Sequence, residues 1–189
     1  MTSPAAANPL AGRADQGSPF DLLVRNGTVI DGTRAPRFDA DVGVRDARIV
    51  FIGRVDDASA GAARQTVDAT ARIVAPGFID CHTHDDTALL TDPQMTPKVS
   101  QGVTTEVTGN CGFSPFPINP EHLQLHLDLL AGIGDDAMAL TWTDLDGYRA
   151  AAESRGIAVN IAPLVGHGAL RIVVLQIVAL VEKHHVPAL

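Results

Sequence analysis

The stretch PGFIDCHTH, residues 76–84, decides how the rest of the chain is interpreted. Pro76-Gly77 favours a turn, and the apolar residues after it favour a β-strand. Side chains alternate between the two faces of a strand, so His82 and His84 are predicted to share one face and Cys81 to point away. Two imidazoles at a strand end can bind one metal ion; zinc suits them, and nickel, copper or iron suit them less selectively.

A His-Thr-His triplet also occurs on solvated strands and as a hydrogen-bonded pair in a core. Its place at the end of a strand favours the metal site, because α/β folds carry their chemistry there. A catalytic metal site takes about three protein ligands and keeps one open position for water. Another part of the sequence must therefore supply at least one further ligand.

Composition narrows the class of protein. The chain has 189 residues, 46% of them hydrophobic, which is enough for a core and one or two domains. Its formal net charge is −8 and it has no basic run, so nucleic acid is not an expected partner. Two cysteines are too few for a disulfide framework and favour the cytoplasm. The apolar segment 173–181 is too short to span a bilayer, so no membrane partner is expected.

The part of the chain before residue 76 is predicted to contain short, mostly antiparallel strands. Asn26-Gly27 is a hairpin signal within 21–30, and Asp46-Ala47 is the expected turn within 41–52. One or two further strands are expected within 65–74. These strands predict a small β-sandwich or half of one.

Strands and helices alternate after residue 76. Strands are expected at 77–83, 103–107 and 157–165, and helices at 96–101, 121–130 and 143–155. Thr143 is the expected N-cap of the last helix and Gly156 its stop, while Leu123, Leu127 and Leu130 are expected on one face of the helix before it. The alternation predicts an α/β fold with parallel strands, as in a barrel or an open sheet.

The domain boundaries follow from these patterns. Residues 1–19 are rich in Ala, Ser, Pro and Gly, which predicts a disordered extension. The predicted organisation is this extension, a β-sandwich segment over 20–75, the first βα units over 76–171 and a tail over 172–189. Only about three βα units fit, whereas a closed (β/α)8 barrel needs about 200 residues or more.

Cys111 is the next candidate ligand. It follows the 103–107 strand and lies at the same predicted sheet edge as His82 and His84. A thiolate there can bind a metal or act as a nucleophile. A small buried thiol in a tight turn is the other interpretation, and both stay open. Cys81 is predicted to pack in the core.

Other polar residues have weaker patterns. Asp85 and Asp86 either orient a ligand histidine and bind substrate, or form a solvated pair or helix N-cap. His167 also follows a strand, and both a site role and a solvent-facing role are open. The remaining histidines are predicted to be exposed: His122, His126, His184 and His185. Trp142 and Tyr148 are predicted to pack in the core.

Three motifs resemble one family. They are PGFIDCHTHDD, QGVTTEVTGNCGFSP and NIAPLVGHGALR, and they are similar to the N-acyl-D-amino-acid deacylase (D-aminoacylase) branch of the amidohydrolase superfamily. His-x-His is shared across that superfamily, whereas Gly-Asn-Cys-Gly is more specific to the branch. DLLVRNGTVIDGT at 21–33 also resembles the opening strands of the family. The resemblance extends from Asp21 to Arg171.

The resemblance implies a fold, a cofactor and an activity. The fold is a TIM-like metal-dependent hydrolase barrel beside a small β-sandwich built from N- and C-terminal segments. The cofactor is zinc, with His82, His84 and Cys111 as ligands and Asp86 and His167 near the substrate or the ligands. The activity is hydrolysis of a small N-acyl amino acid to a carboxylate and a D-amino acid, with an aspartate as general base.

The family takes that aspartate and two further histidine ligands from later strands, which are absent from this sequence. The resemblance therefore implies an incomplete barrel in an N-terminal fragment that is inactive alone. Two other functions stay open. One is a different amidohydrolase, such as a dihydropyrimidinase-like or dihydroorotase-like enzyme, against which Gly-Asn-Cys-Gly argues. The other is a non-catalytic metal-binding fragment.

Overall fold

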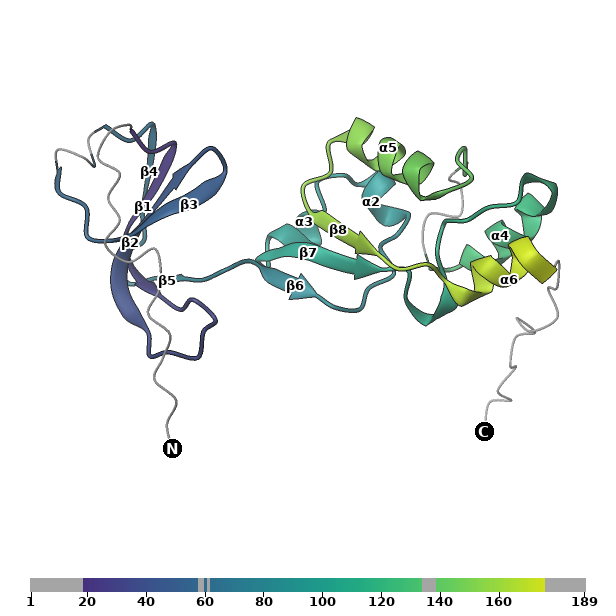
Figure 1. Cartoon of the computed structure of the whole chain (residues 1–189), viewed down its shortest axis with the longest axis horizontal. Coiled ribbons are helices and arrows are strands. Elements are labelled where there is room, and N and C mark those ends of the chain that lie inside the picture. Colours follow the sequence, from purple (N-terminus) through teal and green to yellow (C-terminus); the bar gives the residue numbers. More distant parts are fainter. Residues whose placement is uncertain (1–18, 58–59, 61, 134–138, 176–189) are drawn as a thin grey trace. The chain divides into compact units, whose positions relative to one another are not determined.

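The computed structural model describes residues 19–57, 60, 62–133 and 139–175 (Figure 1). The chain divides into two compact units, whose boundary in the sequence lies between Pro76 and Gly77. Residues 1–18 and 176–189, which include most of the predicted extension and tail, lie outside the described residues. No helix in the described ranges is both long and apolar enough to cross a membrane.

The first unit is a mixed sheet. Its strands are β1 (Leu22–Val29), β2 (Phe38–Arg45), β3 (Arg48–Gly53), β4 (Gln65–Asp68) and β5 (Ile73–Val74), in the order β3-β2-β1-β4, with β5 also paired with β1. β2 is antiparallel to β1 and β3, but β4 and β5 are parallel to β1. The expectation of mostly antiparallel strands is wrong for β4 and β5. The chain leaves β3 at one edge and crosses over to the far side of β1, and such a crossover permits parallel pairing.

Asn26-Gly27 lies inside β1 and does not form the predicted hairpin turn. The register with β2 shifts between Val24 and Gly27, and Asn26 has a φ of 62°. The backbone N–H of Asn26 donates a 2.8 Å hydrogen bond to the carboxylate of buried Asp41. That long-range acceptor satisfies the displaced backbone, so the dipeptide forms a β-bulge.

The other predicted turn of this unit is confirmed. Asp46 and Ala47 connect β2 to β3, with φ values of 50° and 57°. Two consecutive positive φ values are typical of the tight turns that match the twist of a hairpin. Apolar residues cover both faces of the sheet: Phe20, Leu23, Phe51 and Ala60 on one, and Val29, Ala40, Val42 and Ile52 on the other.

The second unit contains a three-stranded parallel sheet of β6 (Phe78–Asp80), β7 (Val103–Thr108) and β8 (Asn160–Pro163), in that order. Helices α2 (Ala88–Thr91) and α3 (Thr96–Val99) connect β6 to β7. The 3₁₀ turns η1 (Asn110–Gly112) and η2 (Pro120–His122) and helices α4 (Leu123–Leu130) and α5 (Leu145–Arg155) connect β7 to β8, and α6 (His167–Leu175) follows. The predicted parallel βα units are confirmed, but the described strands do not close into a barrel.

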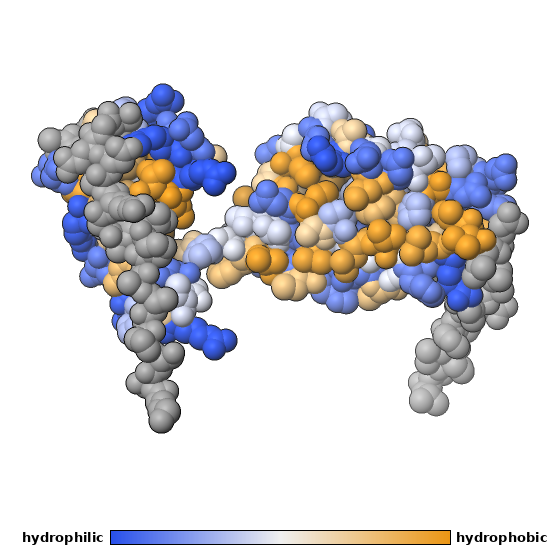
Figure 2. Space-filling view, viewed as in Figure 1, coloured by the Kyte–Doolittle hydropathy of each residue, from blue (hydrophilic) through white to orange (hydrophobic). Residues whose placement is uncertain are grey.

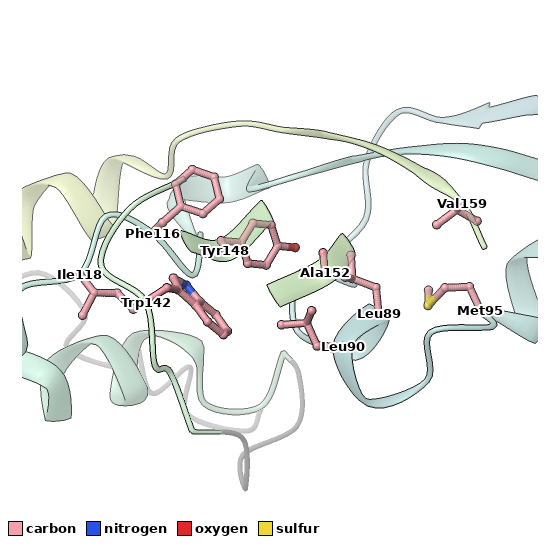
Figure 3. Packing of buried hydrophobic residues seen from close by; sticks show 9 residues of the cluster. All are labelled: Leu89, Leu90, Met95, Phe116, Ile118, Trp142, Tyr148, Ala152 and Val159. Atoms are coloured by element: carbon pink, nitrogen blue, oxygen red, sulfur yellow. The ribbon is translucent and has the colours of Figure 1, made fainter. Parts of the chain in front are cut away.

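The core of this unit lies where α2 packs against α5 (Figures 1 and 3). Its buried residues are Leu89, Leu90, Met95, Phe116, Ile118, Trp142, Tyr148, Ala152 and Val159. The Trp142 indole donates a 2.7 Å hydrogen bond to the carbonyl oxygen of Pro115, which satisfies its polar atom. The predicted packing roles of Trp142 and Tyr148 are confirmed.

Helix α4 buries a face that overlaps the predicted one only in part, since Leu130 is buried as predicted. His126, Leu129 and Leu130 are buried, whereas Leu123 is exposed. Nε2 of His126 accepts a 3.1 Å hydrogen bond from the backbone N–H of Asn119, so a neutral imidazole can replace an apolar side chain there. The prediction that His126 is a surface residue is wrong for this reason.

The N-cap of helix α5 lies one residue later than predicted. Its N-cap is Asp144, whose carboxylate accepts a 2.8 Å hydrogen bond from the backbone N–H of Gly147. Gly156 ends the helix as predicted, with a φ of 66° that glycine tolerates. Asp144 is as good a cap as Thr143, and spacing alone does not separate neighbouring cap candidates.

Apolar side chains are also exposed along the second unit, where Figure 2 shows a band of hydrophobic surface. Phe78 and Ile79 on β6 are 63% and 61% exposed, and Leu164 and Val165 after β8 are about half exposed. β6 is an edge strand of the described sheet. An open strand edge with apolar side chains is a surface prone to pairing with another chain.

Candidate metal site

Three side chains with metal-binding atoms meet beyond the carboxyl ends of β6 and β7. The ligand atoms of His82, His84 and Cys111 all lie within 4.8 Å of one another. Sγ of Cys111 is 3.2 Å from Nε2 of His82, and the two imidazole rings lie edge to face with centroids 5.5 Å apart. The structure thus brings together the three residues that the sequence singles out as candidate ligands.

The two histidines lie in a loop, because β6 ends at Asp80. Strand alternation therefore does not set their direction. The carboxylate of Asp80 instead accepts a 3.2 Å hydrogen bond from the backbone N–H of His82. Cys81 is exposed, and the prediction that it packs in the core is wrong because the strand has already ended.

Cys111 is held by a tight loop. Its φ is 55°, and Gly109 and Gly112 on either side have φ values of 76° and 88°. A Cβ at Gly109 would lie 2.0 Å from the backbone oxygen of Leu164, so only glycine fits there. The loop is thereby packed against the chain that follows β8.

The side chain of Asn110 connects this loop to the histidine loop. Its Nδ2 donates hydrogen bonds of 2.7 Å to the carbonyl oxygen of Val107 and 3.2 Å to that of Thr83. Thr83 lies between the two histidines, and its own N–H donates to Val107 at 3.3 Å. These contacts fix Cys111 relative to the imidazoles.

The donor set fits a zinc ion. Imidazole nitrogens and a cysteine thiolate are the donors that zinc takes in proteins. Nδ1 of His84 is buried without a hydrogen-bond partner among the described residues, and a bound cation would satisfy a histidine in that position. His82 and Cys111 are exposed, so the group is open to solvent on one side.

Asp86 is buried close to these residues. Its carboxylate oxygens have no hydrogen-bond partner among the described residues. Burial raises the pKa of Asp86 to about 6, although the nearby Gly109 N–H and Thr108 hydroxyl oppose the shift. Asp86 is therefore not part of a solvated pair, and the N-cap of α2 is Thr87.

His167 is exposed at the first position of α6 and is not part of the donor group. The adjacent Gly166 N–H donates a 2.9 Å hydrogen bond to the hydroxyl of Ser114, so this loop still lies beside the cysteine loop. His184 and His185 lie outside the described residues.

Two charged residues near the site were missed by sequence reasoning. Lys98 on α3 forms ion pairs with Asp80 and Asp85, at 2.6 and 2.8 Å. Glu106 on β7 is fully buried, and burial followed by the charge of Asp85 raises the pKa of its carboxyl. A carboxylate within the β-branched run VTTEV was a usable signal for Glu106, whereas nothing near Lys98 indicated its partners.

A parallel α/β sheet with two histidines and a cysteine at its carboxyl edge is an arrangement suited to metal-dependent hydrolysis. Residues 65–183 match the sequence profile described as the amidohydrolase family. The chain belongs to this family.

The similar proteins have related names. The chain is 48% identical over 157 residues to a D-aminoacylase of Alcaligenes xylosoxydans xylosoxydans, covering 83% of this chain and 31% of that protein. It is 44% identical over 156 residues to an N-acyl-D-aspartate deacylase of the same organism, covering 82% of this chain and 30% of that protein. The chain thus spans about a third of the length of these relatives.

A solved structure agrees with the fold. The crystal structure of N-acyl-D-glutamate deacylase from Bordetella bronchiseptica, complexed with zinc and a phosphonate inhibitor, has a TM-score of 0.69 and 40% sequence identity. The match covers 82% of this chain and 31% of that one. The shared fold therefore includes most of both units described above, and the relative holds a metal.

Proposed function

We propose that the chain binds zinc through His82, His84 and Cys111, as part of an N-acyl-D-amino-acid deacylase. The convergence of these three side chains within 4.8 Å is the observation that carries the proposal. Their identity favours zinc over a hard cation, which prefers oxygen ligands. The names of the relatives support the reaction, which is hydrolysis of an amide to a carboxylate and a D-amino acid.

Bound zinc would supply Lewis acidity at an amide carbonyl and lower the pKa of a bound water. The residues of this chain contribute the positioning. The tight loop aims Sγ of Cys111 toward His82, and Asn110 holds the backbone between the two histidines. Asp86 and His167 are proposed to lie near the substrate or behind the ligands, at the same edge of the sheet.

The barrel and the composite sandwich are part of this proposal. The parallel strands β6, β7 and β8 would be the first three strands of a TIM-like barrel, and the β1–β5 sheet would be part of the sandwich. In that arrangement the general-base aspartate comes from outside the 189 residues, so the chain alone is expected not to turn over substrate.

Metal binding without catalysis is the second candidate function. Within the described ranges, only His82, His84 and Cys111 come together as a possible ligand group. Three donors can retain zinc, but hydrolysis also needs a base that exchanges protons with the substrate. A different amidohydrolase is less well supported, because the relatives that match the Gly-Asn-Cys-Gly region at 44–48% identity are acylases and deacylases.

The test compares the two cysteines of the chain. Zinc content and affinity are measured for the wild type, Cys111→Ala and Cys81→Ala, because Cys81 is an exposed thiol that lies outside the donor group. Loss of binding in Cys111→Ala with retention in Cys81→Ala supports the proposal. Equal zinc binding by all three proteins contradicts it.

Incubation of the zinc-loaded chain with N-acetyl-D-amino acids tests whether these 189 residues alone catalyse the hydrolysis. Zinc retention without hydrolysis supports metal binding alone for these 189 residues. Release of the D-amino acid from these substrates, with no release of the L-amino acid from the matching N-acetyl-L-amino acids, supports the deacylase activity directly.

A further inference from the structure

The ammonium group of Lys98 contacts three side chains of one short loop. Nζ lies 2.6 Å from Oδ2 of Asp80 and 2.8 Å from Oδ2 of Asp85. It also donates a 3.0 Å hydrogen bond to the hydroxyl of Thr83. Asp80 precedes the histidine pair, Thr83 lies between its members and Asp85 follows it, so one cation holds the loop at three points.

The contacted side chains form further hydrogen bonds with the loop backbone or with each other. Asp80 accepts from the backbone N–H of His82, and the Thr83 hydroxyl donates to the carboxylate of Asp85. The side chains of Lys98, Asp80 and Asp85 are only 22%, 29% and 25% exposed. Partial burial makes such a charged network stronger than an exposed ion pair, which contributes little.

Lys98 stays charged under ordinary conditions. Partial burial favours its neutral form, but the hydrogen bonds to Asp80 and Asp85 outweigh this and raise its pKa to about 12. The buried carboxyl of Glu106 also lies in the field of this ammonium group. Removal of Lys98 would leave several acidic groups near one another without a compensating cation.

We propose that Lys98 is a positioning residue that fixes the 80–85 loop so that His82 and His84 face Cys111. This inference rests on the proposed zinc site, although the ordering of the loop can be measured without metal. Supporting residues around metal ligands act by fixing ligand orientation, and their loss typically weakens metal binding about 10- to 100-fold.

The metal-free experiment measures the loop directly. Backbone ¹⁵N relaxation is recorded for the wild type and Lys98→Met without zinc. Rigid backbone has order parameters of about 0.85 and flexible backbone of less than about 0.6. We expect residues 81–85 to move from the first range toward the second while β7 and α5 are unchanged. Unchanged order in the loop of a folded Lys98→Met protein overturns the inference.

The second experiment measures zinc affinity by competition with a chelator. Lys98→Met is expected to bind about 10- to 100-fold more weakly than the wild type. Arg149→Met is the matched control, since it removes a cation from an exposed ion pair with Glu153 in the same unit. Wild-type affinity is expected for this control, and equal weakening in both variants would overturn the specific role of Lys98.

Two conservative variants keep the test decisive if Lys98→Met does not fold. Lys98→Arg keeps the charge and is expected to restore part of the affinity, while Thr83→Val removes one of the three contacts and is expected to lower it. Wild-type loop order together with wild-type zinc affinity in Thr83→Val would contradict the three-point arrangement, and a Lys98→Arg protein as weak as Lys98→Met would contradict the role of the charge. A wild type that binds no zinc refutes the proposed function, and the relaxation experiment then still decides the role of Lys98.

Discussion

The hydroxyl of Tyr148 donates a 2.7 Å hydrogen bond to the backbone carbonyl oxygen of Asp86. Tyr148 is fully buried on α5, with ring centroids 5.2 Å from Phe116 and 5.6 Å from Trp142 (Figure 3). Burial, and then the charges of Asp86 and Glu106, raise the pKa of this phenol, which keeps it a donor. The core is thereby linked to the chain two residues beyond His84.

Tyr148→Phe should lower the free energy of unfolding by about 1–3 kcal/mol, since it leaves a buried carbonyl without its donor. Urea unfolding measures the difference. Thr91→Val is a suitable control, because it removes an exposed hydroxyl that donates to Ala88 at 3.0 Å. The control should change stability by less than about 0.5 kcal/mol, and equal losses in both variants would argue against the buried bond.

Gly109→Ala should be much more damaging than Gly156→Ala. Both glycines have positive φ, at 76° and 66°, but a Cβ at Gly156 meets no atom within 4 Å, whereas at Gly109 it lies 2.0 Å from the oxygen of Leu164. The left-handed backbone alone costs about 1–2 kcal/mol, and the steric overlap adds about 1–3 kcal/mol. Urea unfolding and zinc affinity check this, since only Gly109→Ala should also disturb Cys111.

The buried His126 predicts acid sensitivity. Burial, and then the charge of His122, lowers its pKa below the ordinary value. Below pH ~6.5 the unfolded chain therefore binds a proton at His126 more readily than the folded chain does. The free energy of unfolding consequently falls as the pH falls, by at most about 1.4 kcal/mol per pH unit.

His126→Gln isolates this contribution. A glutamine oxygen can still accept from the backbone N–H of Asn119 but does not titrate. Unfolding curves between pH 7 and pH 5 should show a smaller decline for the variant than for the wild type. Parallel declines would assign the acid sensitivity to other groups.

The exposed edge strand predicts self-association. Ile79→Lys places a charge on β6, where the side chain is 61% exposed, and should lower the aggregated fraction measured by sedimentation. Leu145→Gln changes a residue that is 44% exposed on a helix and should have little effect. A similar reduction in both would indicate general surface hydrophobicity instead of edge pairing.

Local patterns predicted some elements well. β7 follows from the β-branched run VTTEV, and the end of α5 follows from Gly156, because both signals act within a few residues. Asn26-Gly27 was misread because its backbone partner, Asp41, lies 15 residues away. The crossover that makes β4 parallel to β1 likewise depends on long-range packing.

In the candidate site, too, local patterns predicted some residues, whereas long-range contacts determined the others. His82, His84 and Cys111 were found from their chemical type and their place after strands. Lys98 was missed because its partners are set by the three-dimensional position of α3, and His126 because the backbone N–H that satisfies it lies outside its own helix. The type of a residue predicts whether it can be a metal ligand. Which residues hold that ligand in place depends on long-range contacts, and spacing in the sequence does not show these.

The close contact between Gly109 and Leu164 also has a consequence for biosynthesis. All three candidate zinc ligands have been translated once the ribosome passes Cys111, but the backbone that confines the cysteine loop arrives more than fifty residues later. A nascent chain therefore presents all three donors before the backbone that packs against the cysteine loop is available. Ordered metal capture is expected to be a late event in synthesis, timed by the emergence of β8.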